Sequence, residues 1–129
     1  MREILFRGQD IHGNWHIGLL AHIGNAWYIS NKAGVATAFE VIPSTVGQYT
    51  GLTDKNGTKI FEGDIVKFCT ELKEICFVDY GKGKYILRQL KKDKHLSWQS
   101  IDIFELFGLE CEVIGNIHDN PELMKGAGQ

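Results

Sequence analysis

Three histidines near the N-terminal end come closest to the pattern of a metal site. His12, His16 and His22 lie near one another in the sequence, and the imidazole nitrogen is a common ligand of zinc. On a β-strand His16 and His22 share a face, but His12 falls beside Gly13 in an expected turn. No acidic or cysteine side chain joins them at the spacing of a metal motif. We therefore expect surface or half-buried polar histidines, with no metal and no cofactor.

The cysteines are the candidate nucleophiles, and a reactive cysteine needs a neighbouring base or positive charge. Cys69 precedes "TELKE", Cys76 lies in an apolar run, and Cys111 stands between Glu110 and Glu112, whose charges disfavour a thiolate. The sequence also has no nucleophile elbow, phosphate-binding loop or dinucleotide fingerprint. We expect no catalytic residues and no enzyme activity, with an unrecognised enzyme as the least favoured alternative.

A basic segment is the strongest candidate for binding a ligand. Asp93 is the only acid between residues 82 and 94, whereas residues 102–112 carry acids and no base. The candidate nucleic-acid-binding residues are Lys82, Lys84, Tyr85, Arg88, Lys91, Lys92 and Lys94. Such a hairpin can hold a phosphate backbone while an aromatic ring stacks on a base. The alternative is a solvated hairpin whose lysines protect an edge strand, and the net charge of −2 favours it.

Composition predicts a folded domain made of short strands. The chain has 129 residues, 43% of them hydrophobic. Its 15 glycines and 2 prolines suit a protein with many tight turns. The chain has 3 cysteines, and this odd number argues against a disulfide framework and for a reducing compartment. No apolar run is long enough for a signal peptide or a membrane span. We expect a soluble cytoplasmic protein without a membrane partner.

Alternating apolar residues and turn signals predict strands along most of the chain. The expected strands are residues 3–7, 15–23, 26–30, 35–42, 46–52, 58–61, 65–69, 75–80, 84–90 and 111–117. The central stretch "VGQYTGLTDKNGTKIFEGDIVKF" combines a hairpin turn at Asn56-Gly57 with a corner at residues 62–64. At that corner we expect the Asp64 carboxylate to accept a backbone N–H. These polar residues therefore have structural explanations.

The pairing of residues 65–69 with residues 75–80 can be tested by asking which register keeps one face apolar. One register sets Phe68 opposite Val78 and Val66 opposite Tyr80. A second sets Cys69 opposite Cys76 but leaves Val66 facing an acid. The hydrophobic pattern favours the first register.

The C-terminal part is less regular. For residues 95–110 we favour a loop with one helical turn over an irregular strand. Asn120 is expected to cap a final helical turn that begins at Pro121, and residues 125–129 to form a flexible tail.

Four motifs carry a resemblance to a known family. "FRG", "GNWHIGLL", "IPSTVGQYTGLTDKNGTKIFEGDIV" and "EVIGNIHDNPEL" occur in the order seen in YopX-like proteins, which are small proteins of bacteriophages and prophages in Gram-positive bacteria. The chain resembles them over about residues 4–124, most specifically from Tyr49 to Val66. The resemblance implies an all-β fold of coiled antiparallel sheets, and it brings no catalytic residues.

The combined expectation is an all-β chain of two parts. Residues 1–45 form a small meander, residues 46–124 an SH3-like barrel with a minor helix near its C-terminus, and residues 125–129 the tail. The resemblance implies a homo-oligomer, with a closed ring of five as one arrangement and phage or host proteins as further partners. The meander has too many apolar residues for one buried face, and we expect interface residues at Trp15, Trp27 and Tyr28.

We therefore expect a phage- or prophage-encoded, non-catalytic assembly or interaction protein in the cytoplasm of a bacterial host. A nucleic-acid-binding module that uses residues 82–94 is the alternative.

Overall fold

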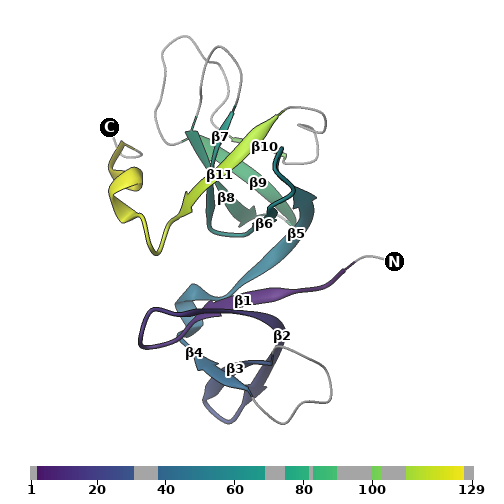
Figure 1. The fold of residues 1–129 in the computed structure, drawn as a ribbon, viewed down its shortest axis with the longest axis vertical. Coiled ribbons are helices and arrows are strands. Elements are labelled where there is room, and N and C mark those ends of the chain that lie inside the picture. The colour runs from purple at the N-terminus through teal and green to yellow at the C-terminus, as the bar shows by residue number, and fades with distance from the viewer. Residues whose placement is uncertain are drawn as a thin grey trace. The chain divides into compact units, whose positions relative to one another are not determined.

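The computed structural model describes residues 3–30, 38–68, 75–81, 83–89, 100–102 and 110–126. Figure 1 shows that their regular structure consists of strands and short helical turns. The strands are β1 (Phe6–Gln9), β2 (Trp15–Ile23), β3 (Ala26–Ser30), β4 (Phe39–Val41), β5 (Gly47–Thr53), β6 (Lys59–Phe61), β7 (Asp64–Phe68), β8 (Ile75–Gly81), β9 (Lys84–Gln89), β10 (Ser100–Asp102) and β11 (Cys111–Asn116). The 3-10 turns are η1 (Pro43–Thr45) and η3 (Pro121–Gly126). The prediction of an all-β fold is confirmed.

The chain divides into two compact units, Met1–Gly51 and Leu52–Gln129. The division falls inside β5, whereas the boundary drawn from the sequence, between residues 45 and 46, lies just before that strand. The SH3-like description of residues 46–124 stays a prediction.

Unit 1 is an antiparallel sheet in the order β4-β3-β2-β1-β5. The sheet bends so far that β4 returns to β1, because the N–H of Ile42 donates to the carbonyl oxygen of Gln9 at 2.8 Å. Next to this contact the N–H of Gln9 donates to Oγ1 of Thr45 in η1 at 2.9 Å. Both contacts therefore tie the segment that follows β4 to Gln9, the last residue of β1.

The inner face of this bent sheet is the core of unit 1. Ile29 on β3 and Val41 on β4 are buried, and the ring of His16 stacks on Phe39 with centroids 4.1 Å apart. On β2 the side chains of His16 and Leu20 point inward because they alternate with the outward residues of the strand.

Unit 2 contains a second antiparallel sheet in the order β10-β9-β8-β7-β11, and the last part of β5 forms a hairpin with β6. Its core is a cluster of buried side chains with small exposed fractions. The cluster consists of Ile60, Val66, Phe68, Cys76, Val78, Tyr85 and Leu87, with Leu52, Cys111 and Val113 packed against it. Nearly every residue of the central strand β7 is buried, as expected for a strand that is covered on both faces.

The register predicted between β7 and β8 is wrong. Val66 pairs with Cys76 and Ile65 pairs with Phe77, so β8 is shifted along β7 from either predicted alignment. The predicted face is nevertheless correct, since Val66 and Cys76 both lie in the core. Hydrophobic alternation fixes only which face a residue takes, and a shift by an even number of residues leaves the faces unchanged. The turn before β7 sets the shift, because the N–H of Gly63 donates to the oxygen of Val78 at 2.8 Å.

The favoured loop and helical turn in residues 95–110 is wrong at Ser100–Asp102, which form β10. Ile101 of β10 pairs with Leu87 of β9, so this short strand is specified by its neighbour rather than by its own sequence. Residues 95–99 and 103–109 lie outside the described residues.

The C-terminal helical turn is present as η3, but the expected cap is wrong. Oδ1 of Asn120 accepts the N–H of Asn116 at 3.1 Å, so the side chain faces back to the end of β11. The turn itself is closed by the N–H of Leu123, which donates to the carbonyl oxygen of Asn120 at 3.0 Å. Just before this contact, the pairing of β11 with β7 has a bulge between Val113 and Gly115.

Candidate functional site

The polar residues that could do chemistry lie mostly at strand corners. Asp10 begins the turn between β1 and β2, where its Oδ1 accepts the N–H groups of His12 and Asn14, each at 2.9 Å. Its Oδ2 lies 2.8 Å from Nε2 of His16. The hydrogen bond from His16, helped by those from the backbone, lowers the pKa of Asp10 to about 2. Both oxygens of the Asp10 carboxylate therefore serve to stabilise the turn.

Asp54 repeats this arrangement in unit 2 and extends it. Its Oδ1 accepts the N–H groups of Asn56 at 2.8 Å and Thr58 at 2.9 Å. Its Oδ2 accepts the N–H of Val113 at 3.0 Å, which ties the β5–β6 turn to β11. Burial raises the pKa of Asp54, but the backbone N–H groups outweigh it and the net pKa lies below the usual value. Lys55 adds a second tie, since its N–H donates to the oxygen of Cys111 at 3.0 Å.

Asp64 holds the next corner, as predicted. The residue is 1% exposed, and its Oδ2 accepts the N–H of Phe61 at 2.7 Å. A buried carboxylate of this kind stabilises a turn and is not accessible to a substrate.

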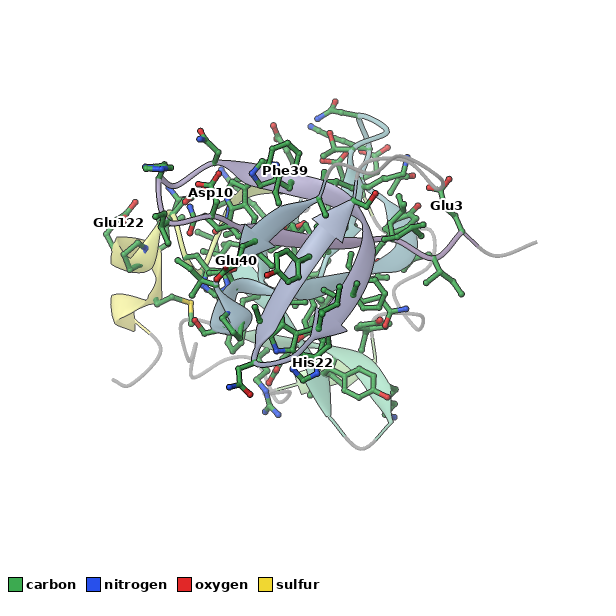
Figure 2. All side chains as sticks on the ribbon, turned by 90° about the horizontal axis from the view of Figure 1, so that it is seen from below. Glu3, Asp10, His22, Phe39, Glu40 and Glu122 are labelled. Carbon is green, nitrogen blue, oxygen red and sulfur yellow. The ribbon has the colours of Figure 1, made fainter. Side chains whose placement is uncertain are left out.

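The structure does not gather the histidines into one site. His12 is exposed in the β1–β2 turn, His16 bonds Asp10 and stacks on Phe39, and the ring of His22 stacks on Trp27 with centroids 4.1 Å apart. Among the described residues there is no group of histidine, cysteine or acidic side chains that could hold a metal ion. Asp10 and His22 are labelled in Figure 2.

The cysteines that the structure describes belong to the core. Cys76 is fully buried, and Cys111 packs against the same cluster from β11. Burial in apolar surroundings suits a structural role rather than a nucleophile. Cys69 lies outside the described residues.

The basic hairpin is described only in part, because Lys82, Lys91, Lys92 and Lys94 lie outside the described residues. Lys84 is exposed at the start of β9, and Nε of Arg88 donates to Oδ2 of Asp79 at 2.6 Å. Tyr85 is 5% exposed and belongs to the core, so its ring offers no free face for a base. Tyr80, opposite Tyr85 on β8 and 52% exposed, is an accessible ring in the described part of this hairpin. Nucleic-acid binding stays a prediction.

The outer face of unit 1 carries several exposed apolar side chains. Ile17, Leu19 and Ile23 on β2 are 46%, 46% and 67% exposed. Their spacing of two, or multiples of two, puts them on one face, together with Trp15 and Ala21. We call these five residues the outer stripe. Large apolar side chains gathered in one strand are typical of a surface that binds another protein.

The residues beside the outer stripe are fixed by the sheet register. Tyr28 of β3 pairs with Ala21 of the outer stripe and, on its other side, with Glu40 of β4. Tyr28 and Glu40 therefore lie on the outer face as well. Arg7 of β1 pairs with Ile17, and its guanidinium lies 4.9 Å from the centre of the Trp15 ring. The outer face therefore joins an apolar centre to one cation and one anion.

The residues predicted at an interface separate onto two faces. Trp15 and Tyr28 lie on the outer face, whereas Trp27 lies on the inner face against His22. The sequence prediction omitted Ile17, Leu19 and Ile23, although they alternate along the same strand as Trp15. The signal for them is that apolar residues occupy every outward position of β2.

Comparison with known proteins identifies the family of the chain. The model of the YopX protein family matches residues 19–125, which include the second part of β2 and the described strands that follow it. The chain belongs to the YopX protein family. The predicted resemblance is thereby confirmed.

A solved structure has a similar fold. It is the crystal structure of protein EF1440 from Enterococcus faecalis, with a TM-score of 0.57 and 24% sequence identity, covering 96% of this chain and 99% of that chain. At this identity the likeness shows the fold alone. No curated protein matches the YopX chain described here. Within the described residues, no helix is long and apolar enough to cross a membrane.

Proposed function

We propose that this YopX protein is a non-catalytic interaction protein that assembles as a homo-oligomer. The observation that carries the proposal is the outer stripe, whose exposed members Ile17, Leu19 and Ile23 occupy one face of the longest strand of unit 1. Exposed apolar surface costs free energy in water, and a binding partner removes that cost.

A non-catalytic role is supported by what the polar side chains do. Asp10, Asp54 and Asp64 each accept backbone N–H groups that their turns would otherwise leave unsatisfied. A general acid or base must reach its substrate and carry a pKa suited to proton transfer near neutral pH. The lowered pKa of Asp10 and that of Asp54 keep both carboxylates charged near neutral pH, which suits structural groups.

The biological setting of the proposal rests on the family. The proposal places the gene on a phage or prophage and the protein in the cytoplasm of the bacterial host, as the resemblance to YopX-like proteins implies. The partner in this setting is first another copy of the chain, and through the assembly a phage or host protein.

Light scattering coupled to size exclusion tests the proposal. At micromolar concentration we expect a mass that is a multiple of the 14.5 kDa chain. Leu19→Lys should lower that mass, because a charge would replace an apolar contact. Ile11→Lys is the matched control, since Ile11 is 82% exposed in the β1–β2 turn and lies off the sheet. A monomer mass for the unmodified protein would overturn the proposal.

A further inference from the structure

The turn between β5 and β6 contains a pair of residues that can react with each other. Asn56 is followed by Gly57, and no other asparagine in the sequence precedes a glycine. Both residues are exposed, and Gly57 has a positive φ of 82°. Within the described residues the side-chain amide of Asn56 makes no hydrogen bond. This amide can therefore rotate toward the peptide nitrogen that follows it.

An asparagine in this position can lose its side-chain amide without an enzyme. The backbone nitrogen of Gly57 attacks Cγ of Asn56, and the new N–Cγ bond closes a succinimide ring. The side-chain nitrogen leaves as ammonia and takes the proton of the attacking N–H. Water then opens the ring at either carbonyl group, which gives aspartate or isoaspartate. The attack is favoured because it is intramolecular and because glycine has no Cβ that obstructs its nitrogen.

The folded turn holds the attacking nitrogen away from this reaction. The N–H of Gly57 donates to the carbonyl oxygen of Asp54 at 3.0 Å. The N–H groups of the residues on either side, Asn56 and Thr58, donate to Oδ1 of the same aspartate at 2.8 Å and 2.9 Å. A local opening of the turn must break these hydrogen bonds before the nitrogen reaches Cγ. Asp54 therefore controls how often the pair can react.

We propose that Asn56-Gly57 is a site of spontaneous deamidation gated by Asp54, and that isoaspartate formed there loosens the tie between the β5–β6 turn and β11. In isoaspartate the main chain runs through Cβ and Cγ of the residue, so the turn becomes one atom longer. The N–H groups at positions 56 and 58 then no longer fit one carboxylate oxygen. Oδ2 of Asp54 accepts the N–H of Val113 at 3.0 Å, so a displaced carboxylate loses this bond as well. The modification acts within unit 2 and does not depend on self-association.

Peptide mapping by mass spectrometry tests the site. The folded protein is aged in warm, mildly alkaline buffer, and conversion of amide to acid is followed at each asparagine. Asn25 is the internal control, since it is exposed in the β2–β3 turn but precedes Ala26. We expect conversion at Asn56 to be at least about tenfold faster than at Asn25, because glycine leaves the attacking nitrogen unobstructed. Equal rates at the two residues, or conversion of Asn56 only in the urea-unfolded chain, overturn the proposal.

Asp54→Asn tests the gate. The substitution keeps an acceptor oxygen but removes the charge, and the weaker hydrogen bonds should speed conversion at Asn56 about tenfold. An unchanged rate contradicts the gate. Should this variant lose its melting transition, the unmodified protein decides, and Asn56 must then convert more slowly in the folded chain than in urea. Equal rates in the two states overturn the gate.

Hydrogen exchange tests the consequence at the N–H of Val113. In isoaspartate protein purified after ageing, protection of this N–H should fall about tenfold. Asn56→Asp is the matched control, because it adds the same charge but leaves the backbone at its original length, and its protection should stay within about threefold of the unmodified protein. Equal exchange in the isoaspartate form and in Asn56→Asp overturns the proposed loosening.

Discussion

Gly8 on β1 faces Val41 on β4 so closely that no side chain fits between them. A Cβ built on Gly8 would lie 2.9 Å from Cβ of Val41 and 2.9 Å from its Cγ2, closer than real Cβ atoms approach. Val41 is 3% exposed and branched at Cβ, so it has little room to move. The close approach is where the bent sheet of unit 1 meets itself.

Gly8→Ala should therefore destabilise the protein by about 1–3 kcal/mol, because overpacking forces the backbone or Val41 to shift. Urea unfolding followed by tryptophan fluorescence measures the change. Gly81→Ala is the control, since its Cβ would meet only ordinary contacts, the nearest at 3.6 Å. Adding Val41→Ala to Gly8→Ala should cost less than the sum of the single changes, and strict additivity would contradict the proposed clash.

Asp54→Ala should destabilise unit 2 by about 2–3 kcal/mol, because it leaves several backbone N–H groups without their acceptor. Asp54 is 7% exposed, so water replaces the carboxylate only in part. Hydrogen exchange should show the largest loss of protection at Val113, whose N–H donates to Oδ2 of Asp54. Equal loss throughout unit 2 would mean that the residue has no specific tie to β11.

Stability should fall in acid partly through Asp10. Its pKa is lowered from 3.8 to about 2 in the folded protein, so the folded state favours the charged form. The contribution is complete above the unfolded value and is lost as pH falls through the folded one. Between about pH 4 and pH 2, Asp10→Asn should show a flatter dependence of melting temperature on pH than the unmodified protein. Parallel curves would exclude Asp10 as a source of the dependence.

Trp27 and Tyr28 should respond differently to the same change, because they point to opposite faces of β3. Trp27→Ser removes the ring stacked on His22 and should lower the melting temperature. Tyr28→Ser changes the outer face and should weaken self-association, with a smaller effect on melting. Each protein is measured by both thermal melting and sedimentation, and a reversed pattern would contradict the assignment of faces.

The sequence was sufficient for the strands and turns that carry local signals. Alternation gave β2 and β3 with the observed bounds, and Asn56-Gly57 marked the β5–β6 turn, where Gly57 has a positive φ of 82°. Asp64 was predicted to accept a backbone N–H, and it does. Each of these features depends on residues close in the chain.

Features that depend on residues far apart in the chain could not be predicted from the sequence. Nothing near Asp54 in the sequence indicates that its second oxygen meets Val113, and nothing near Ser100 indicates a strand until β9 is beside it. The outer face illustrates the same limit, because Glu40 joins Tyr28 and Ala21 only through strand pairing. Its apolar part could be predicted from β2, but its charges could not.

The tie between Asp54 and Val113 also bears on how the chain folds while it is being synthesised. Unit 1 ends at Gly51, so all of its strands are available soon after that residue leaves the ribosome. Strand β7 instead waits for β11, which is synthesised well after it. We expect unit 1 to fold before unit 2 during synthesis, with the edge of β7 open to chaperones until β11 has emerged.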